Sequence, residues 1–508
     1  MNGKKEYGDY QTPEYFAKEV CKFLKDEKHL EPKYIIEPTC GVGAFIEGSL
    51  IFDAEMIYGV EINEEYCDKC IDNIHDERVK IFNADFFGFE YEKIINEKDD
   101  ILILGNPPWV TNSALSQLNS QNLPLKNNFK GLKGMDAITG ASNFDICEYM
   151  ILYLISLLIG KKFTIAMLCK TSVARNIFEN LLKRDYKFCE FEIYEIESKK
   201  IFNISASACL LLIQFSDLET SSEKCTVYDF KEKKLLSEIK YDGQGIVNES
   251  IQSIDDFLGE SCFEWRKGVK HDCSKVMELQ KKDEGFINGL KENINIEDKY
   301  IYPLMKSSMF KSPIISEYKK YVIVTQKKIK EDTSHIKNDA PLTWKYLMDH
   351  EEYFDKRKSS IYLNSPKFSM FGIGEYSYEE YKVGISGFYK KPVFSLLIPE
   401  NNKPVMIDDT GYFISFKEYE MAYTAMLILN SEKVQDFLCN ISFSDAKRPY
   451  TKKILNKIDF KKILDIVDLK YLQDTESTLN LNPFIDEKMY IIFKDFVAQN
   501  SVQKLFNL

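Results

Sequence analysis

The stretch from residue 35 to residue 43 reads Ile-Ile-Glu-Pro-Thr-Cys-Gly-Val-Gly. An apolar run ends there in an acid, and a turn with two glycines one residue apart leads into a helical pattern. Gly41 and Gly43 let the backbone pass close to a ligand because glycine has no Cβ atom. A strand, a Gly-x-Gly turn and a helix in this order fit a dinucleotide site, a site for another nucleoside, or no site at all.

The same alternation of strand and helix continues outward from this turn over the first 215 residues. The expected strands, separated by helical patterns, are residues 34–37, 56–61, 79–83, 101–105, 163–168 and 209–215. Such alternation predicts an α/β fold with a doubly wound, Rossmann-like sheet. Ligands of these sheets bind at the carboxyl ends of the strands, so the residues that follow each strand are the candidates for a functional site.

Length and composition predict more than one domain. The chain has 508 residues and a hydrophobic fraction of 44%, which is enough for real cores and excludes a wholly disordered chain. The alternation lapses into polar residues at 216–224, and Asp-Gly-Gln-Gly follows at 242–245. We therefore expect an α/β domain over residues 1–245 and a mixed α+β domain over residues 246–508.

Cysteine usage and hydropathy indicate the compartment. The twelve cysteines are irregularly spaced, no signal peptide opens the chain, and the longest apolar stretch, residues 149–160, is too short to span a bilayer. We expect a cytoplasmic protein with reduced thiols and no membrane contact. The single Cys-x-x-Cys, formed by Cys67 and Cys70, has no second pair, so we expect no metal site.

Two acids indicate the chemistry of the ligand at the glycine turn. Glu61 ends the next expected strand, 18 residues after Gly43, where a carboxylate can accept hydrogen bonds from both hydroxyls of a ribose. The third glycine of the dinucleotide fingerprint is missing, and Glu37, directly before the turn, disfavours a pyrophosphate. A nucleoside with a positive charge fits both observations, and S-adenosylmethionine, a sulfonium with an α-ammonium group, is such a ligand.

The residues after the third and fourth expected strands extend this pattern. Asp85 can accept a hydrogen bond from an exocyclic amine and Phe86 can lie against a purine, although packing at a strand end accounts for both residues equally well. Residues 106–109, Asn-Pro-Pro-Trp, form the most specific motif in the chain. The two prolines fix the backbone and remove two N–H donors, which leaves oxygen acceptors for a planar amine beside an aromatic stacking face.

In this order, the motifs resemble those of the class I S-adenosylmethionine-dependent DNA adenine-N6 methyltransferases of the gamma group. In that group the cofactor motif and the Asn-Pro-Pro-aromatic motif come early, and a target-recognition domain comes last. Tyr-Gln-Thr-Pro at residues 10–13 is similar to the leading motif, which helps to close over the methionine end of the cofactor. The resemblance covers residues 7–215 by motif. It implies a site-specific enzyme of a type II restriction-modification system that flips an adenine out of double-stranded DNA and methylates its N6 amine.

The resemblance also implies roles for individual residues at the cofactor. The cofactor-binding residues would be Thr12, Glu37, Cys40, Gly41, Gly43, Glu61, Ile62, Asp85, Phe86 and Asn106. Within this set, Thr12 and Glu37 would lie at the methionyl part, Glu61 would hold the ribose, and Ile62 and Phe86 would enclose the adenine.

The catalytic motif implied by the resemblance consists of Asn106, Pro107, Pro108 and Trp109. Asn106 and the Pro107 carbonyl would accept the two hydrogens of the target amine, so no general base is required before the attack. Trp109 stands where tyrosine is commoner and keeps the face that would stack on the target base. We assign Phe202 to the other face of the base pocket, although a plain core phenylalanine fits this position as well.

Basic residues in two regions are the expected DNA contacts. The polar segment 111–143 holds Lys126, Lys130 and Lys133, which would bind phosphates unless the segment is simply a solvated loop. The net charge of −12 comes from residues 1–250, with 29 basic and 41 acidic side chains, whereas residues 251–508 hold 38 of each. Basic-aromatic clusters in this electroneutral half favour DNA binding together, although each alone fits a solvated face. Their basic residues are Arg266, Lys267, Lys390, Lys391, Lys447, Arg448, Lys452 and Lys453.

Three alternatives remain open at this stage. Enzymes with a similar Asn-Pro-Pro-aromatic motif methylate RNA adenine or a protein glutamine, but residues 246–508 form a larger second half than those enzymes need. The third alternative is the methyltransferase part of a bifunctional restriction enzyme, which is disfavoured because the leading motif begins at residue 10 and no nuclease constellation follows. We expect a monomer, with a cognate restriction endonuclease as a further candidate partner.

Overall fold

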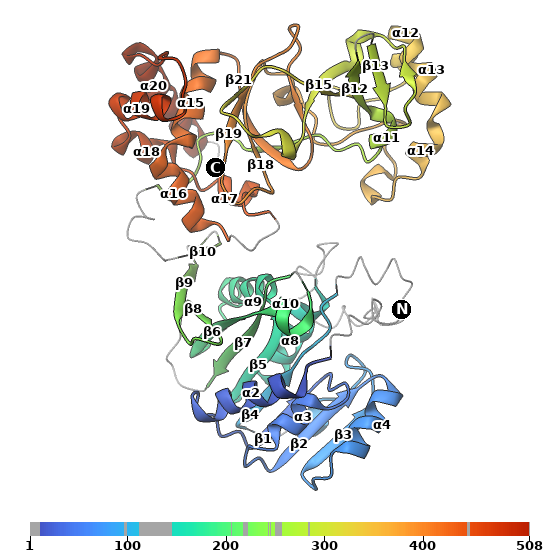
Figure 1. Ribbon diagram of the computed structural model, residues 1–508, viewed down its shortest axis with the longest axis vertical. Helices are drawn as coiled ribbons and strands as arrows, with labels where there is room; N and C mark the ends of the chain where they lie inside the picture. Colours follow the sequence, from blue (N-terminus) through green and yellow to red (C-terminus); the bar gives the residue numbers. More distant parts are fainter. Residues whose placement is uncertain are drawn as a thin grey trace. The chain divides into compact units, whose positions relative to one another are not determined.

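The computed structural model shows a chain that divides into two compact units, Met1–Ser250 and Ile251–Leu508. Figure 1 draws the first unit in blue to green and the second in yellow to red. The residues that the structure describes are 11–95, 99–110, 145–204, 206–216, 222–241, 243, 245–248, 257–282, 285–443 and 448–506.

A ten-stranded sheet forms the centre of the first unit, with the strand order β10-β9-β8-β6-β7-β5-β4-β1-β2-β3. Its strands are β1 (Tyr34–Glu37), β2 (Met56–Glu61), β3 (Val79–Asn83), β4 (Ile101–Gly105), β5 (Phe163–Lys170), β6 (Glu190–Ile196), β7 (Ala208–Phe215), β8 (Lys224–Asp229), β9 (Leu235–Tyr241) and β10 (Ile246–Asn248). Strands β3, β2, β1, β4 and β5 run parallel, and β7 is antiparallel to both of its neighbours. The α/β sheet that the alternation predicted is confirmed. Because β10 pairs with β9, the first unit continues past residue 245.

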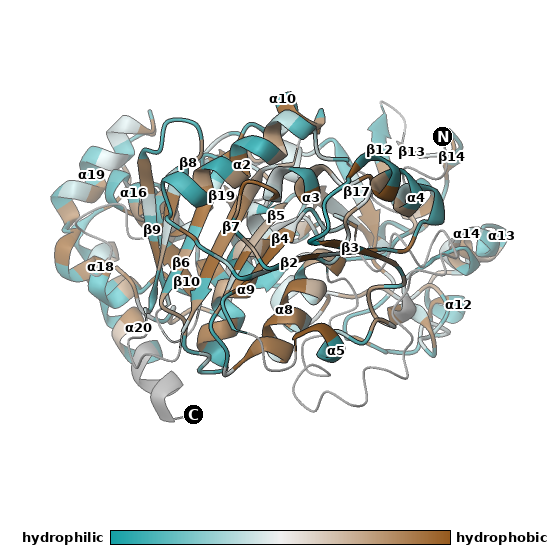
Figure 2. Ribbon diagram, turned by 90° about the horizontal axis from the view of Figure 1, so that it is seen from below, coloured by the Kyte–Doolittle hydropathy of each residue, from teal (hydrophilic) through white to brown (hydrophobic). Residues whose placement is uncertain are grey.

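Helices cover both faces of this sheet. They are α2 (Glu14–Asp26), α3 (Ala44–Ser49), α4 (Glu64–Asn73), α5 (Glu92–Ile95), α8 (Ile146–Leu158), α9 (Thr171–Lys183) and α10 (Ser198–Phe202). Figure 2 shows α2, α3 and α4 on one face and α5, α8 and α9 on the other, with hydrophobic strands between them. Every residue of β4 is buried, as expected for a parallel strand that is covered on both sides.

The second unit contains two sheets and a group of C-terminal helices. The five-stranded sheet has the order β11 (Arg266–Lys267), β21 (Gly411–Phe416), β18 (Tyr381–Ser386), β19 (Phe394–Leu397) and β16 (Ile314–Ile315). The six-stranded sheet has the order β14 (Asn293–Ile294), β13 (Gly285–Asn288), β12 (Glu278–Lys282), β17 (Lys320–Ile323), β15 (Ile301–Met305) and β20 (Met406–Ile407).

The helices of the second unit are α11 (Ser274–Met277), α12 (Ile336–Asp339), α13 (Pro341–Asp349), α14 (Glu351–Asp355), α15 (Tyr419–Asn430), α16 (Glu432–Ile441), α17 (Lys452–Leu455), α18 (Phe460–Ile466), α19 (Leu469–Thr478) and α20 (Glu487–Phe506). The buried helix α15 packs on the five-stranded sheet and on α16, α19 and α20, and so joins the helices to the sheet in one core. Among the described helices of the chain, none has the length and apolarity needed to cross a membrane.

Candidate active site

Four polar residues predicted from separate stretches of sequence lie at one edge of the first unit's sheet. Glu37, Glu61, Asp85 and Asn106 end or follow β1, β2, β3 and β4. The carboxyl ends of parallel strands share one edge, and the strand register places Glu37 beside Gly59 and Glu61 beside Asn83. The fold therefore brings together residues that are up to 69 positions apart in the sequence.

The glycine turn is held against Glu61. Gly41 and Gly43 have φ angles of +55° and +94°, which favour glycine, and a Cβ atom on Gly43 would lie 2.6 Å from the Cys70 Sγ. The Gly41 amide donates to Glu61 Oε2 at 2.8 Å, and the Asn63 amide donates to Oε1 at 2.8 Å. Two backbone amides thereby fix the Glu61 carboxylate against the turn.

Glu37 carries a buried carboxyl group whose negative charge a cationic ligand would compensate. Its side chain is 3% exposed, and within the described part of the chain its Oε2 has no hydrogen-bond partner. Burial raises the pKa of Glu37 well above its ordinary value, and the neighbouring Cys70 and Glu61 raise it further. Gly105 lies close by, since a Cβ atom there would come within 3.1 Å of the Glu37 Cγ. A cationic ligand at this place would offset the cost of burying the carboxylate.

The leading segment reaches both the glycine turn and the catalytic motif. Asn106 Nδ2 donates to Thr12 Oγ1 at 3.2 Å, which engages the donor end of the amide and turns the acceptor Oδ1 away from Thr12. Gln11 lies over the turn, because a Cβ atom on Gly41 would come within 2.6 Å of its Oε1. Gln11 had no predicted role, although its place beside Thr12 in the leading motif was a usable signal.

Trp109 is fixed at two points. Its indole Nε1 donates to the Leu168 carbonyl at 3.3 Å, and its own carbonyl accepts from Lys170 Nζ at 3.1 Å. Lys170 also donates to Asp145 Oδ2 at 2.6 Å, and Asp145 caps the start of α8 by accepting from the Cys147 amide at 3.1 Å. Burial raises the pKa of Asp145, and Lys170 opposes that rise. No local sequence pattern connects Lys170 with Trp109, so sequence reasoning missed this contact.

Phe202 lies against Trp109. The two ring centroids are 5.4 Å apart at an interplanar angle of 68°, an edge-to-face contact. A base held between two rings needs a centroid separation of about 7–8 Å, twice the usual contact distance. The structure thus brings the two residues assigned to the base pocket together, but in this conformation they contact each other and leave no gap for a base.

The residues expected at the cofactor adenine surround the ends of β2 and β3. Asn83 Nδ2 donates to the Glu61 and Ile62 carbonyls at 3.0 and 3.3 Å and ties the two strand ends together. Asp85 Oδ2 accepts from the Gly88 amide at 3.0 Å. Ile62 is 45% exposed, whereas Phe86 is buried among other aromatic rings. The exposed Ile62 side chain at the end of β2 offers an apolar surface that a ligand can cover.

Comparison with known proteins decides the family. No protein-family profile matches the chain. The Type II methyltransferase M.NspV of Nostoc sp. (strain ATCC 29411 / PCC 7524) is 41% identical over 473 residues, which cover 91% of this chain and 98% of that protein. The chain belongs to the type II methyltransferases. It is therefore a restriction-modification methyltransferase, and its methyl donor is S-adenosylmethionine.

Solved structures agree with this methyltransferase fold. The type IIL restriction-modification enzyme MmeI in complex with DNA matches 98% of this chain and 74% of its own, with a TM-score of 0.52 at 13% identity. The DrdV–DNA complex matches 91% of this chain and 57% of its own, with a TM-score of 0.54 at 12% identity. At these identities the likeness establishes the fold, and it extends over both units of the type II methyltransferase.

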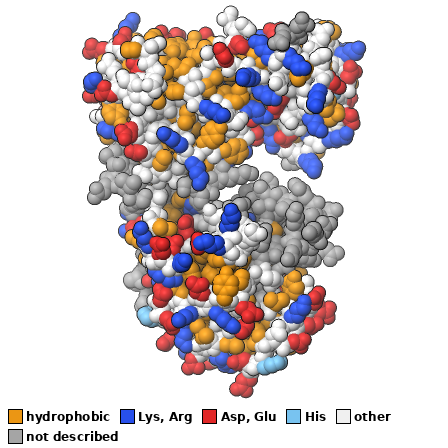
Figure 3. Space-filling view, in the orientation of Figure 1, with side chains coloured by type: hydrophobic (Ala, Val, Ile, Leu, Met, Phe, Trp, Pro, Cys, Tyr) orange, Lys and Arg blue, Asp and Glu red, His pale blue; other side chains and the backbone are white. Residues whose placement is uncertain are grey.

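In the second unit of this type II methyltransferase, the predicted basic clusters lie next to one another. Arg266 and Lys452 both form ion pairs with Glu264, the latter at 3.6 Å. The Arg448 guanidinium lies 4.8 Å from the centre of the Phe388 ring, and the Tyr450 hydroxyl donates to the Lys390 carbonyl at 2.5 Å. Lys391 and Lys453 are exposed. Figure 3 shows lysine and arginine side chains on the drawn face of this unit.

Several predictions fall outside what the structure describes. Lys126, Lys130, Lys133 and Lys447 belong to the undescribed ranges 111–144 and 444–447. Cys40 and Cys70 lie side by side, and burial together with the hydrogen bond that the Cys40 thiol donates to Cys70 raises the pKa of Cys40. Within the described ranges, no group of three or more His, Cys, Asp or Glu side chains is arranged to hold a metal ion.

Proposed function

We propose that this type II methyltransferase transfers a methyl group from S-adenosylmethionine to the N6 amine of an adenine in double-stranded DNA. The observation that carries the proposal is the placement of residues 106–109 at the same sheet edge as the glycine turn and Glu37. A motif of neutral acceptors next to a pocket for a cationic nucleoside suits transfer to a planar amine. The methylated sites would be protected from a cognate restriction endonuclease.

The residues at the strand ends fit S-adenosylmethionine. Glu37 would face its cationic methionyl part, because this buried carboxyl has an oxygen without a described partner. Glu61, fixed by two backbone amides, would accept the ribose hydroxyls. Ile62 and Phe86 would enclose the adenine ring, and Asp85 would accept from its amine. The lack of Cβ atoms at Gly41 and Gly43 lets Gln11 and Cys70 pack directly against the turn and so helps to fix its shape.

The catalytic motif would orient the target amine. S-adenosylmethionine supplies the methyl group when it is bound. Asn106 Oδ1 and the Pro107 carbonyl would each accept one hydrogen of the amine, which draws its lone pair out of the ring and stabilises the positive charge that develops on nitrogen. The Thr12 hydroxyl holds the amide of Asn106 in the orientation this needs. Positioning of this kind contributes much of the rate enhancement.

The target base would have to leave the duplex, because its amine cannot be reached inside the helix. Trp109 would then stack on the extruded base, and such stacking is worth ~1–3 kcal/mol per base. Since Phe202 contacts Trp109 at 5.4 Å between ring centroids, Phe202 would turn aside to admit the base. The ring of Phe202 thus fills the pocket while no base is present.

The second unit would bind the DNA around its recognition site. The support is the convergence of three basic-aromatic clusters on one region, together with the fold likeness to two proteins solved as DNA complexes. Lysine and arginine side chains suit contacts with phosphates, and the aromatic rings next to them suit contacts with bases. We propose that the enzyme acts as a monomer.

A single assay tests the reaction. The protein is incubated with tritiated S-adenosylmethionine and unmethylated genomic DNA, and the nucleosides are then separated. N6-methyladenine is expected for the wild type and is expected to be lost in Asn106→Ala, which should still bind DNA. Asn180→Ala is the matched control, because Asn180 is a partly buried asparagine on α9 whose Nδ2 contacts Glu148 at 3.4 Å, away from the site. Label in cytosine, RNA or protein glutamine, or near wild-type methylation by Asn106→Ala, would refute the proposal.

A further inference from the structure

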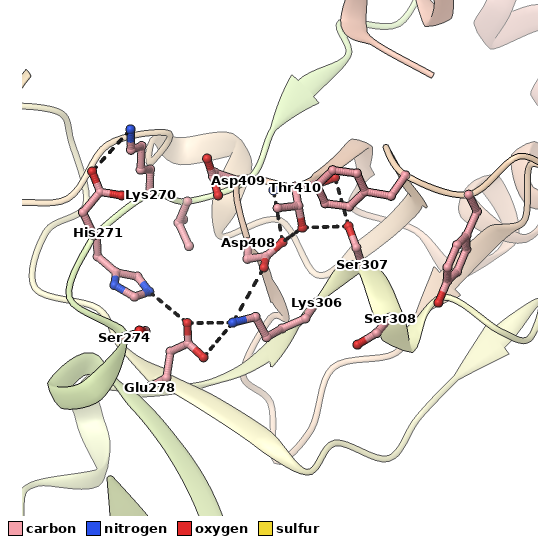
Figure 4. A pocket seen from close by; sticks show the side chains of 14 residues that line it. Lys270, His271, Ser274, Glu278, Lys306, Ser307, Ser308, Asp408, Asp409 and Thr410 are labelled. Carbon is pink, nitrogen blue, oxygen red and sulfur yellow. Dashed lines mark hydrogen bonds and ion pairs between the residues drawn. The ribbon is translucent and has the colours of Figure 1, made fainter. Parts of the chain in front are cut away.

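The second unit contains a polar pocket of about 680 Å³ to which the reaction gives no role. Its lining comes from the segments around β11, β12, β15, β18 and β20, and Figure 4 shows how the side chains face one another. Four carboxylates and two lysines line it, together with several hydroxyl groups. The pocket therefore offers both hydrogen-bond acceptors and donors, with an excess of negative charge.

The inner wall of the pocket is a fixed network. Lys306 Nζ donates to both oxygens of Glu278 at 2.8 Å and lies 3.9 Å from Asp408 Oδ2. Asp408 Oδ1 accepts from the Thr410 amide at 3.1 Å and from its hydroxyl. His271 Nε2 lies 3.7 Å from Glu278 Oε1, and burial lowers the pKa of His271, which keeps its ring neutral near pH 7. These groups are occupied with one another and form a rigid floor.

The outer groups are held more loosely. Lys270 Nζ lies 3.3 Å from Asp272 Oδ2, and each side chain is one-third exposed. Lys267 Nζ lies 3.5 Å from Asp409 Oδ2, and both side chains are similarly accessible. Exposed ion pairs contribute little to stability, so either partner can exchange its contact for one with a ligand at low cost.

The backbone that carries the outer pair is nevertheless rigid. Lys270 exchanges two backbone hydrogen bonds of 2.8 Å with Phe371, and the buried His271 ring accepts from the Cys273 amide at 3.1 Å. Asp272 between them has a φ of +49°, in the left-handed region that non-glycine residues rarely adopt. Residues held in such conformations are concentrated at functional sites.

The basic clusters adjoin this pocket. Phe388 and Tyr389 line it, the Arg448 guanidinium lies over the Phe388 ring, and Lys390 follows directly. Phosphate contacts in protein–DNA interfaces surround the contacts to bases and position them. The excess of carboxylates makes the pocket itself unsuited to a phosphate, whereas the clusters beside it suit one.

We propose that the Lys270–Asp272 pair, with Asp409 as a neighbouring acceptor, reads the major-groove edge of one G·C base pair in the recognition site. The cytosine N4 amine donates to a carboxylate, and the guanine O6 and N7 accept from an ammonium group. The pair presents this acceptor and donor side by side, as the two halves of a G·C edge require. The inference rests on the proposed function, since it assumes that the second unit binds the methylated DNA.

The test is a specificity profile of the full-length protein. The recognition site is first mapped from methylated genomic DNA, and duplexes are then made in which one base pair at a time is replaced. For Asp272→Asn and Lys270→Met, kcat/KM on the cognate duplex is expected to fall about 5- to 150-fold. Both variants should lose discrimination between the cognate base pair and its replacements at one and the same G·C position. The salt dependence of DNA binding should stay unchanged in both. Asp339→Asn is the control, because Asp339 forms an ion pair with Lys299 at 3.1 Å outside the pocket.

Two results would overturn the inference. The first is a profile that both variants leave unchanged at every position. The second is a uniform loss of affinity for all duplexes with a flatter salt dependence, which would mean that Lys270 contacts a phosphate. If the wild type methylated a base other than adenine, the proposed reaction would be refuted. The specificity profile would still show whether the pocket reads a base pair, so failure of the reaction and failure of the inference are distinguishable.

Discussion

Lys170 connects the catalytic motif to the body of the first unit, and its replacement by methionine separates positioning from chemistry. Lys170 Nζ donates to the Trp109 carbonyl at 3.1 Å and to Asp145 Oδ2 at 2.6 Å, with its side chain 24% exposed. Lys170→Met keeps the aliphatic stem and removes both donors. Asp145 then remains as a buried carboxyl without its cation, and the carbonyl of Trp109 loses its anchor.

The structure sets the size of both effects. A hydrogen bond to a charged, largely buried group contributes ~1.5–3 kcal/mol, so the free energy of unfolding should fall by that amount. Release of residues 106–109 should lower kcat by about 10- to 100-fold, since a displacement of an ångström at a reacting group has effects of this order. Lys183→Met removes an exposed pair with Glu179 on α9 and should change stability by no more than ~0.5 kcal/mol.

Urea unfolding and single-turnover methylation measure these quantities. The double variant Lys170→Met with Asp145→Asn carries no uncompensated charge, so it should regain stability while kcat stays low, because the Trp109 carbonyl still lacks its donor. The affinity for S-adenosylmethionine should be unchanged in Lys170→Met, in Lys183→Met and in the double variant. Recovery of kcat together with stability in the double variant, or an unaffected kcat in Lys170→Met, would show that Lys170 has only a structural role.

Two further predictions concern the first unit. Burial raises the pKa of Glu148 to about 7, although a hydrogen bond from Asn176 opposes this rise, so the folded protein holds a proton that the unfolded chain releases at lower pH. The bound proton stabilises the folded wild type fully below pH 4.5, and this stabilisation is lost as the pH rises to 7. In urea unfolding at a series of pH values, the free energy of unfolding of the wild type should fall over this range by about 3 kcal/mol relative to that of Glu148→Gln. An equal pH dependence of the two proteins would contradict this prediction. Gly43→Ala should lower the melting temperature more than Gly160→Ala, because both have a positive φ but only the Gly43 Cβ would meet another atom, the Cys70 Sγ at 2.6 Å. Equal shifts in thermal unfolding would show that the clash is absorbed.

Local patterns predicted the parallel half of the first sheet. Strands β1 to β4 have the bounds expected from the sequence because each is a short, mainly apolar run that ends in a polar residue or a glycine, although β3 is only partly buried. Strand β6, in which three glutamates interrupt the apolar residues, and the partly exposed strands β8 and β9 were not anticipated. Their pairing depends on β7 and on one another, a tertiary preference that short-range periodicity does not encode.

The same difference separates the site residues that could be predicted from those that could not. Glu37, Glu61 and Asn106 follow strands directly, so the sheet alone places them at one edge. Lys170 ends β5, the strand next to β4, and contacts the Trp109 carbonyl, whereas Gln11, although it stands in the leading motif, contacts the turn at Gly41. Such contacts join residues about 30 and 61 positions apart and leave no trace in spacing.

In the proposed reaction, the leading segment would link cofactor binding to catalysis. Gln11 packs on the turn at Gly41, and the adjacent Thr12 accepts from the amide of Asn106. Because neighbouring residues cannot move independently, a ligand that orders the glycine turn also restrains Thr12 and, through it, the orientation of the catalytic amide. The acceptor Oδ1 would thus be set for the amine at the same time as the methyl donor is held, which would favour the transition state over binding of either substrate alone.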